Sequence, residues 1–316
     1  MEIKKVVVAG GGVLGSQIAY QAAYCGFDVT VWLRSDASIG RTKPKLDHLR
    51  TVYADTIRQM AGPEGKTPAV WARGIAPDPE TFSPDACLAK SEAAYAGLRL
   101  ETDLATAVRD ADLVIESMAE DKKEKIAFYK RLAPLLPENT LLVTNSSTLL
   151  PSVFARYTGR PEKFLSLHFA NSIWRNNTAE VMSQEKTAPE NFETICAFAE
   201  AINMIALPVR KEKSGYLLNS MLVPLLFSGL DLWVNGISDP ESIDRAWTLG
   251  TGAPKGPFRI LDTVGLTTAY NIVQMYVKIP PFLAPYNFRG MAKKLKEYID
   301  AGKLGVSSGE GFYRYH

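Results

Sequence analysis

Residues 6–16 read VVVAGGGVLGS, a short apolar run that leads directly into a glycine-rich turn. A helical pattern, QIAYQAA, follows at residues 17–23, and a second apolar run, DVTVW, occupies residues 28–32. A glycine pattern alone is weak support for any site. Here it stands after a strand and before a helix, and a second strand follows at the right spacing, so the sequence predicts a βαβ unit that binds a dinucleotide.

Each glycine of this turn has a separate expected purpose. Gly10 permits the tight turn, Gly12 lets backbone N–H groups approach a pyrophosphate, and Gly15 lets the helix pack close to its strand. The phosphates would lie at the helix N-terminus, where Val13 and Leu14 begin the first turn.

The chain departs from the usual NAD pattern after the second strand. An acidic residue is expected there to hold the ribose 2′-OH, but Leu33 stands in its place, followed by Arg34 and Ser35. A guanidinium and a hydroxyl are groups that bind a 2′-phosphate, so we expect NADP(H) to be preferred and NAD(H) to be possible. Two more basic side chains follow closely, Arg41 and Lys43. In the alternative, Arg34 is a solvated surface residue and Asp36 serves the ribose from a shifted register.

Three residues with matching chemistry lie downstream. His168 stands in the alternating run FLSLHF, which is typical of a buried strand end, and Glu180 is the lone charged residue of the next run, TAEVM. A carboxylate can orient an imidazole that exchanges a proton with a hydroxyl. Ser147 and Asn145 would lie where a third strand ends, within reach of a reacting oxygen. This set predicts an alcohol/ketone oxidoreductase, and neither His48 nor His316 competes for the catalytic role.

Composition limits the other possibilities. With 316 residues, 46% of them hydrophobic, the chain can bury a large core, and a net charge of +2 without a basic stripe argues against nucleic acid as a partner. Three cysteines without a CxxC pair fit reduced thiols in a cytoplasm. We see no signal-peptide pattern and no apolar run near the roughly 18 residues that a membrane span needs, and we expect no metal site.

Alternating strand and helix patterns predict an α/β fold, with a Rossmann-type parallel sheet domain over residues 1–209. Residues 62–97 interrupt the alternation with five prolines among small residues, which indicates an inserted arm or loop. Residues 210–316 show only helical patterns and Gly-Pro turns, so an all-helical C-terminal domain is expected for substrate binding and dimerisation.

A set of motifs in matching order resembles the L-3-hydroxyacyl-CoA dehydrogenase family over nearly the whole chain outside residues 62–97. Besides the glycine turn, these motifs are LVIES (113–117), NSST (145–148), HFAN (168–171), GYLLN (215–219), GPF (256–258) and GEGFY (309–313). Within the family, the segments around Asn145 and Asn171 most resemble the bacterial diketoreductase branch.

The resemblance assigns roles to these residues. It implies that His168 is the general acid/base, that Glu180 orients it, and that Ser147 and Asn219 hydrogen-bond the substrate oxygen. Four further residues match the family's contacts around the nicotinamide half of the cofactor: Glu120, Lys125, Asn145 and Asn171. Two readings stay open, namely Asn219 as a helix-packing amide and Lys125 as a solvated helix charge.

The substrate is the least defined part of the resemblance. The family's proline-rich stretch after the histidine is replaced here by the bulkier NSIWRNN, residues 171–177, and residues 62–97 coincide with the region that helps hold coenzyme A. The resemblance itself implies interconversion of a 3-hydroxy and a 3-keto group on an acyl-CoA, but these two departures prevent CoA recognition from being assigned residue by residue. The alternative is a diketoreductase for β-keto or β,δ-diketo acids or esters, with Arg175 near a substrate oxygen.

Two broader expectations follow. The resemblance and the apolar helical domain favour a homodimer. A catalytically silent nucleotide-binding protein is the alternative from another class, because a fold does not guarantee activity.

Overall fold

A computed structural model describes residues 2–315 and divides the chain into two compact units, Met1–Leu217 and Leu218–His316. The division comes later than the boundary expected after Val209. The reason lies in the segment that follows the last strand, because the ring of Tyr216 is buried against Met182 and Val209 of the first unit.

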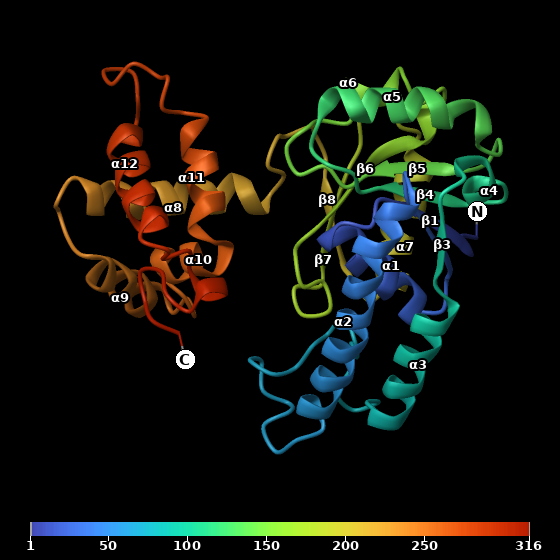
Figure 1. Cartoon of the computed structure of the whole chain (residues 1–316), viewed down its shortest axis with the longest axis horizontal. Helices are drawn as coiled ribbons and strands as arrows, with labels where there is room; N and C mark the ends of the chain where they lie inside the picture. The colour runs from blue at the N-terminus through green and yellow to red at the C-terminus, as the bar shows by residue number, and fades with distance from the viewer. Residues whose placement is uncertain (1, 316) are drawn as a thin grey trace. The chain divides into compact units, whose positions relative to one another are not determined.

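One eight-stranded sheet organises the first unit, in the order β3-β2-β1-β4-β5-β6-β7-β8 (Figure 1). All neighbouring strands are parallel except β6 and β7, which are antiparallel. The strands are β1 (Lys5–Ala9), β2 (Asp28–Trp32), β3 (Arg99–Glu101), β4 (Leu113–Glu116), β5 (Leu141–Thr144), β6 (Phe164–Phe169), β7 (Thr178–Met182) and β8 (Ile205–Val209). The predicted Rossmann-type sheet is confirmed, with β7 and β8 reversed relative to the other strands.

Helices cover both faces of this sheet, as expected for central strands with apolar residues on both sides. The helices α1 (Val13–Tyr24) and α7 (Pro189–Ala201) pack on one face. The opposite face is covered by α4 (Leu104–Val108), α5 (Lys122–Leu132) and α6 (Ser152–Ala155) (Figure 1). Short 3-10 turns lie at Ala133–Leu135 and Pro161–Lys163.

A helical arm extends from this sheet. The helices α2 (Asp36–Met60) and α3 (Pro84–Gly97) lie side by side and share an apolar core with α1 and Trp174 (Figure 1). The segment 62–97, expected as an inserted arm or loop, contributes α3 to this arm in its last third. Residues 84–97 are rich in alanine, the best helix former, and the hydroxyl of Ser83 caps the helix by accepting from the N–H of Ala86.

The second unit is helical, as predicted. Its helices are α8 (Leu218–Val234), α9 (Pro240–Thr251), α10 (Pro257–Val264), α11 (Leu266–Gln274) and α12 (Phe288–Asp300), followed by a 3-10 turn at Val306–Ser308. Two buried carboxylates organise its turns. Asp244 accepts from the N–H of Phe258, and Asp262 accepts from the N–H groups of Phe312 and Tyr313. The GPF and GEGFY motifs thus serve the packing of this unit.

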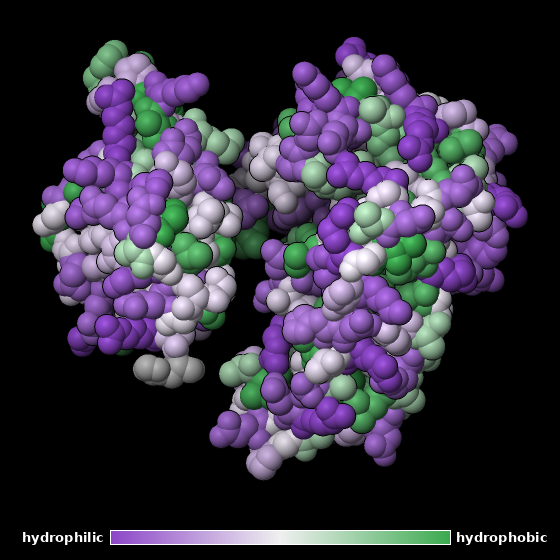
Figure 2. All heavy atoms as spheres, viewed as in Figure 1, coloured by the Kyte–Doolittle hydropathy of each residue, from purple (hydrophilic) through white to green (hydrophobic). Residues whose placement is uncertain are grey.

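Hydrophilic residues are spread over the face of each unit shown in Figure 2, with hydrophobic residues in small groups between them. Among residues 2–315, none of the helices is both long enough and apolar enough to cross a membrane.

Candidate active site

Ser147, His168 and Glu180 meet across three neighbouring strands. The antiparallel register places His168 of β6 directly opposite Glu180 of β7. The imidazole Nδ1 lies 2.9 Å from Glu180 Oε2, and Nε2 lies 3.1 Å from the Oγ of Ser147, which follows β5. His168 is 7% and Glu180 4% exposed, so these hydrogen bonds are shielded from water and strengthened by the low local dielectric. The structure brings together the three residues that the sequence predicted.

The partners of His168 determine what each ring nitrogen can do. An ionised carboxylate only accepts hydrogen bonds, so the Nδ1 that faces Glu180 carries a proton. The Nε2 that faces Ser147 can then accept a proton or, in the imidazolium form, donate one. The arrangement therefore leaves one nitrogen for orientation and the other for acid/base chemistry.

The last two residues of the first unit, Tyr216 and Leu217, pack against this triad. The ring of Tyr216 stacks on the imidazole of His168, with centroids 4.5 Å apart and planes 15° apart. Its hydroxyl donates to the carbonyl oxygen of Ser146 at 2.7 Å, and the N–H of Leu217 donates to Glu180 Oε1 at 2.8 Å. Burial raises the pKa of Tyr216 well above its ordinary value, so the phenol stays a proton donor.

Asn145 links the ends of three strands. Its Oδ1 accepts from the N–H of Phe169 at 3.1 Å, beside His168, and its Nδ2 donates to the Oγ of Ser117 at 3.3 Å. Ser117 follows β4, next to the glycine turn that follows β1. The amide thus connects the predicted dinucleotide turn with the strand that carries the imidazole.

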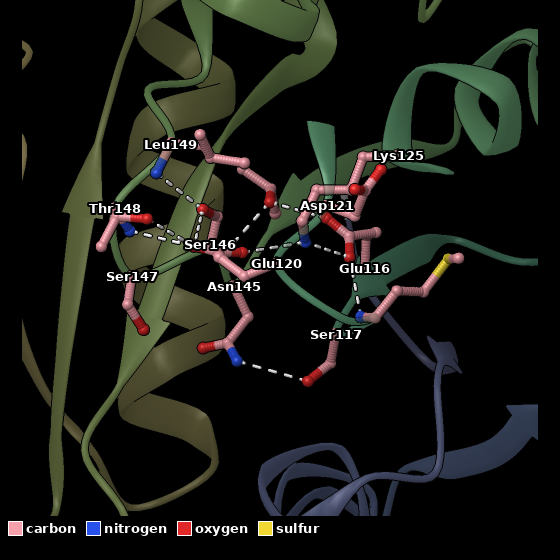
Figure 3. A network of polar contacts seen from close by, with 12 residues as sticks. Glu116, Ser117, Glu120, Asp121, Lys125, Asn145, Ser146, Ser147, Thr148 and Leu149 are labelled. Atoms are coloured by element: carbon pink, nitrogen blue, oxygen red, sulfur yellow. Dashed lines mark hydrogen bonds and ion pairs between the residues drawn. The ribbon is translucent and has the colours of Figure 1, made fainter. Parts of the chain in front are cut away.

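A buried ion pair lies beneath these loops (Figure 3). Glu116 is 0% and Lys125 1% exposed, and the ammonium Nζ lies 2.6 Å from Glu116 Oε1. The carboxylate is fully satisfied, since Oε1 also accepts from the N–H of Met118 and Oε2 accepts from the hydroxyls of Tyr129 and Thr144. Lys125 is therefore not a solvated helix charge. The pair anchors α5 to the end of β4.

Glu120 belongs to the same network of polar contacts (Figure 3). Its Oε1 accepts from the Oγ of Ser146 at 2.5 Å and from the N–H of Thr148 at 3.0 Å, and its Oε2 lies 3.4 Å from Lys125 Nζ. Burial by itself would raise the pKa of Glu120, but the hydrogen bond from Ser146 and the charge of Lys125 lower it below its ordinary value. An ionised carboxylate thus holds the turn that carries Ser147.

The glycine turn fits a dinucleotide pyrophosphate. A Cβ on Gly10 would lie 2.5 Å from the carbonyl oxygen of Ser117, and one on Gly15 would lie 2.1 Å from the carbonyl oxygen of Gly10. Gly10 also has a φ of +120°, which favours glycine. No side chain caps the N-terminus of α1, and the space around the Cα of Gly12 is open, so the first N–H groups can receive an anion.

A pocket of about 250 Å³ lies between this turn and the end of β2. Leu33 and Arg34 line it, together with basic residues from α2, Arg41 and Lys45, and with Ser38. Asp36 does not line this pocket; its carboxylate accepts from the hydroxyl of Thr102 at 3.5 Å.

Other predicted residues lie elsewhere in the described chain. Ser35 stands at the N-terminus of α2, where its hydroxyl contacts that of Ser38. Asn171 is exposed, and its carbonyl accepts from the side chain of Asn176. The guanidinium of Arg175 donates to the carbonyl of Val70 in the arm at 3.0 Å. Asn219 lies in the first turn of α8, in the second unit.

Several residues of the site escaped the sequence interpretation. Tyr216 lay inside a recognised motif but had no assigned role, and Glu116 read as one acidic residue at a strand end. Gly11 was passed over, although a Cβ there would lie 2.1 Å from Thr42 Oγ1 and 2.7 Å from the side chain of Leu33. Lys45 could have been found, because it lies one helical turn after Arg41 on the same face of α2.

The remaining candidates for chemistry are few. His48 lies exposed on α2, away from the triad strands, and His316 lies outside the described residues. Within residues 2–315, no group of three or more His, Cys, Asp or Glu side chains is arranged to hold a metal ion.

Comparisons with known proteins identify the family that the chain resembles. The 3-hydroxyacyl-CoA dehydrogenase NAD binding domain matches residues 80–213, and the C-terminal domain of the same family matches residues 215–315. The human mitochondrial hydroxyacyl-coenzyme A dehydrogenase is 29% identical over 313 residues, which cover 99% of this chain and 91% of the relative. A probable 3-hydroxybutyryl-CoA dehydrogenase of Bacillus subtilis is 29% identical over 315 residues, covering 100% and 98%.

A solved structure is more similar. It is a diketoreductase, described for the substrate-directed dual catalysis of dicarbonyl compounds, with 46% identity, a TM-score of 0.86 and full coverage of both chains.

Proposed function

The chain belongs to the 3-hydroxyacyl-CoA dehydrogenase family, and we propose that its nicotinamide-dependent interconversion of 3-hydroxy and 3-keto groups is carried out by Ser147, His168 and Glu180. The observation that carries this proposal is the pair of contacts on the imidazole, 2.9 Å to the carboxylate and 3.1 Å to the hydroxyl. A complete triad of this kind also disfavours the catalytically silent alternative.

The residues divide the reaction between them. A bound nicotinamide supplies or accepts the hydride at the substrate carbon. In the direction of reduction, His168 Nε2 gives its proton to the carbonyl oxygen, and the resulting alcohol gains one hydride and one proton. Glu180 stabilises the imidazolium, and Ser147 holds the oxygen in line with Nε2. We further propose that Asn219 donates a second hydrogen bond to this oxygen, and that Asn171 binds at the nicotinamide half.

The preferred cofactor is proposed to be NADPH. Leu33 is buried and offers no carboxylate, so nothing at this position repels a 2′-phosphate, and three cationic side chains line the pocket: Arg34, Arg41 and Lys45. Arg34 lies within 3.5 Å of Glu124, an exposed pair of small energetic weight that a phosphate can displace. Charge-assisted contacts to the phosphate would add about 1.5–3 kcal/mol, roughly ten- to a hundredfold in affinity.

A double variant tests the cofactor. Leu33→Asp with Arg34→Ile should reverse the ratio of kcat/KM for NADPH and NADH, since it adds a repulsive group and removes an attractive one. Lys43→Ile is the matched control, because it removes a charge from an exposed position of α2 that does not line the pocket. A wild type that favours NADH severalfold would overturn the preference for NADPH and return the ribose to another partner such as Asp36.

The main substrate class is a 3-ketoacyl-CoA or its 3-hydroxy form. A second candidate is a β-keto or β,δ-diketo acid or ester without CoA, and the loop at residues 171–177 favours it. Trp174 and Arg175 attach this loop to the arm, which gives the region after the catalytic strand a bulkier wall than the family's proline-rich stretch. The 46% identity to a diketoreductase supports the same candidate.

Parallel assays separate the two candidates. NADPH oxidation is measured with acetoacetyl-CoA and with a β,δ-diketo ester under the same conditions. Strict dependence on the thioester supports the acyl-CoA proposal, whereas turnover of the free ester at comparable kcat/KM supports the diketoreductase. Chiral analysis of either product should show the S alcohol, and an R product would contradict the proposed catalytic face.

We also propose a cytoplasmic location, in keeping with the three free cysteines.

A further inference from the structure

Tyr216 stands in an unusual backbone conformation beside the triad. Gly215 has a φ of +82° and Tyr216 a φ of +51°, so two consecutive residues adopt the left-handed region. A bulky side chain rarely adopts it, and such strain persists where the surroundings hold the residue in place and its position matters. The side chain is 1% exposed, so these surroundings are the protein interior.

The two residues after Gly215 contact every member of the triad or its immediate neighbour. The ring of Tyr216 lies parallel to the imidazole of His168 at 4.5 Å. Its hydroxyl donates to the carbonyl of Ser146, the residue before Ser147, at 2.7 Å. The N–H of Leu217 donates to Glu180 Oε1, and the other carboxylate oxygen remains for the imidazole.

We propose that Tyr216 is a positioning residue of the reaction centre, acting through His168 with its ring and through the Ser146–Ser147 turn with its hydroxyl. This inference rests on the catalytic role proposed for the triad. The stacked ring prevents the imidazole from turning about its Cβ–Cγ bond, which would carry Nε2 away from Ser147. The hydroxyl fixes the turn through the carbonyl of Ser146, while the carboxylate of Glu120 accepts from the Oγ of the same residue.

Two substitutions separate the ring from the hydroxyl. Tyr216→Phe keeps the stack and loses the bond to the Ser146 carbonyl, and Tyr216→Leu loses both. Tyr24→Phe is the matched control, because its hydroxyl also donates to a buried backbone carbonyl, that of Ile75 at 3.2 Å, within the arm. For each variant we would measure kcat, the KM of substrate and cofactor, the solvent deuterium isotope effect on kcat, and the unfolding midpoint in urea.

Positioning predicts a specific pattern. Tyr216→Phe should lower kcat about three- to tenfold, the range that one hydrogen bond supplies, with the cofactor KM unchanged and a larger solvent isotope effect, because proton transfer becomes slower. Tyr216→Leu should lower kcat by about a hundredfold, the loss that follows a small misplacement of a reacting group. Tyr24→Phe should lose similar stability but keep the wild-type kcat and isotope effect.

Two kinetic results would contradict a positioning role for Tyr216. Wild-type kcat and isotope effect in Tyr216→Phe, or an equal loss of kcat in Tyr24→Phe, would overturn the inference; the first variant suffices if the leucine variant does not fold. Failure of the underlying proposal looks different, because His168→Gln would then retain activity whatever Tyr216 does.

Discussion

The two ring nitrogens of His168 have partners of different chemistry, and this difference explains the proposed mechanism at the scale of single residues. Glu180 accepts a hydrogen bond from Nδ1 on one side, and Nε2 faces the hydroxyl of Ser147 on the other. The carboxylate is in turn held by the backbone N–H of Leu217. The imidazole is therefore fixed in one tautomer and one orientation before any substrate arrives, which is how a positioned acid/base acts.

His168→Gln should lower kcat by about a hundredfold or more, since a general acid/base contributes roughly 10²–10⁴, while the cofactor dissociation constant stays near wild type. Steady-state kinetics and fluorescence titration with NADPH measure the two quantities. His48→Gln, on the exposed face of α2, is the control for loss of an imidazole. Retention of most activity in His168→Gln would remove this residue from the mechanism.

Glu180→Gln should reduce kcat less than His168→Gln. The amide loses the charge that stabilises the imidazolium but leaves the proton carrier in place. Comparing kcat of both variants with the wild type measures the order of the effects. If the glutamine variant turns over at the wild-type rate, Glu180 serves only to pack the strand pair.

Lys125→Met should destabilise the protein by about 3–5 kcal/mol, because Glu116 would remain buried without its cation. Adding Glu116→Gln should recover part of this loss, since the leftover charge is then removed. Urea unfolding measures both, and Lys122→Met, at an exposed position of the same helix, is the control. If Lys125→Met alone is as stable as the wild type, the ion pair contributes little to the stability of the fold.

Among the secondary-structure elements, the arm and the loop after β6 hold each other. The ring of Trp174 packs in the arm core, and the N–H of Gly74 donates to the Trp174 carbonyl at 3.0 Å. Arg175 donates to arm carbonyls, and Gln21 of α1 donates to the carbonyl of Gly74 at 2.8 Å. The loop that follows the catalytic strand is therefore held to the arm by packing and hydrogen bonds, which supports its proposed role in substrate choice.

Gly74→Ala should loosen this junction, because the added Cβ would lie 2.7 Å from the Cα of Trp174 and 2.9 Å from the Ile173 carbonyl oxygen. We expect a loss of about 1–3 kcal/mol and faster amide hydrogen exchange in residues 61–83 and 171–177. Gly40→Ala, in the open interior of α2, should instead stabilise by about 0.5–1 kcal/mol. Equal stability in both variants would refute the close packing at Gly74.

At the scale of the whole molecule, each unit has its own apolar core, but their surfaces differ. Most of the exposed large apolar side chains among residues 2–315 belong to the second unit, including Met221, Leu249, Met275 and Phe282, which are 67%, 79%, 70% and 84% exposed. Such surface is expected where a partner covers it, and a second copy of the chain is the partner that the family resemblance favours.

The full chain should therefore sediment at about twice the 34.7 kDa of one chain at micromolar concentration. Sedimentation equilibrium over a hundredfold dilution measures the mass and its dissociation. A mass of one chain throughout that range would contradict the homodimer, without affecting the roles proposed for the triad.

Much of this protein was determined by local sequence. The bounds of β2 and β6 were predicted from continuous or alternating apolar runs, because burial of a strand imposes a short period on its own residues. The triad could be predicted for a related reason. A histidine and a glutamate isolated in apolar strands need partners, and each is the natural partner of the other.

Tertiary structure alone decided the rest. Lys125 looked like any lysine on a charged helix, and only the approach of Glu116 from β4 makes it a buried ion pair. The helix of residues 84–97 was hidden by the prolines before it, although packing against α2 stabilises it. Tyr216 is far from His168 in sequence, and Arg175 meets the arm through contacts about a hundred residues apart. Local patterns report the environment of each residue, but its partners depend on how distant segments pack.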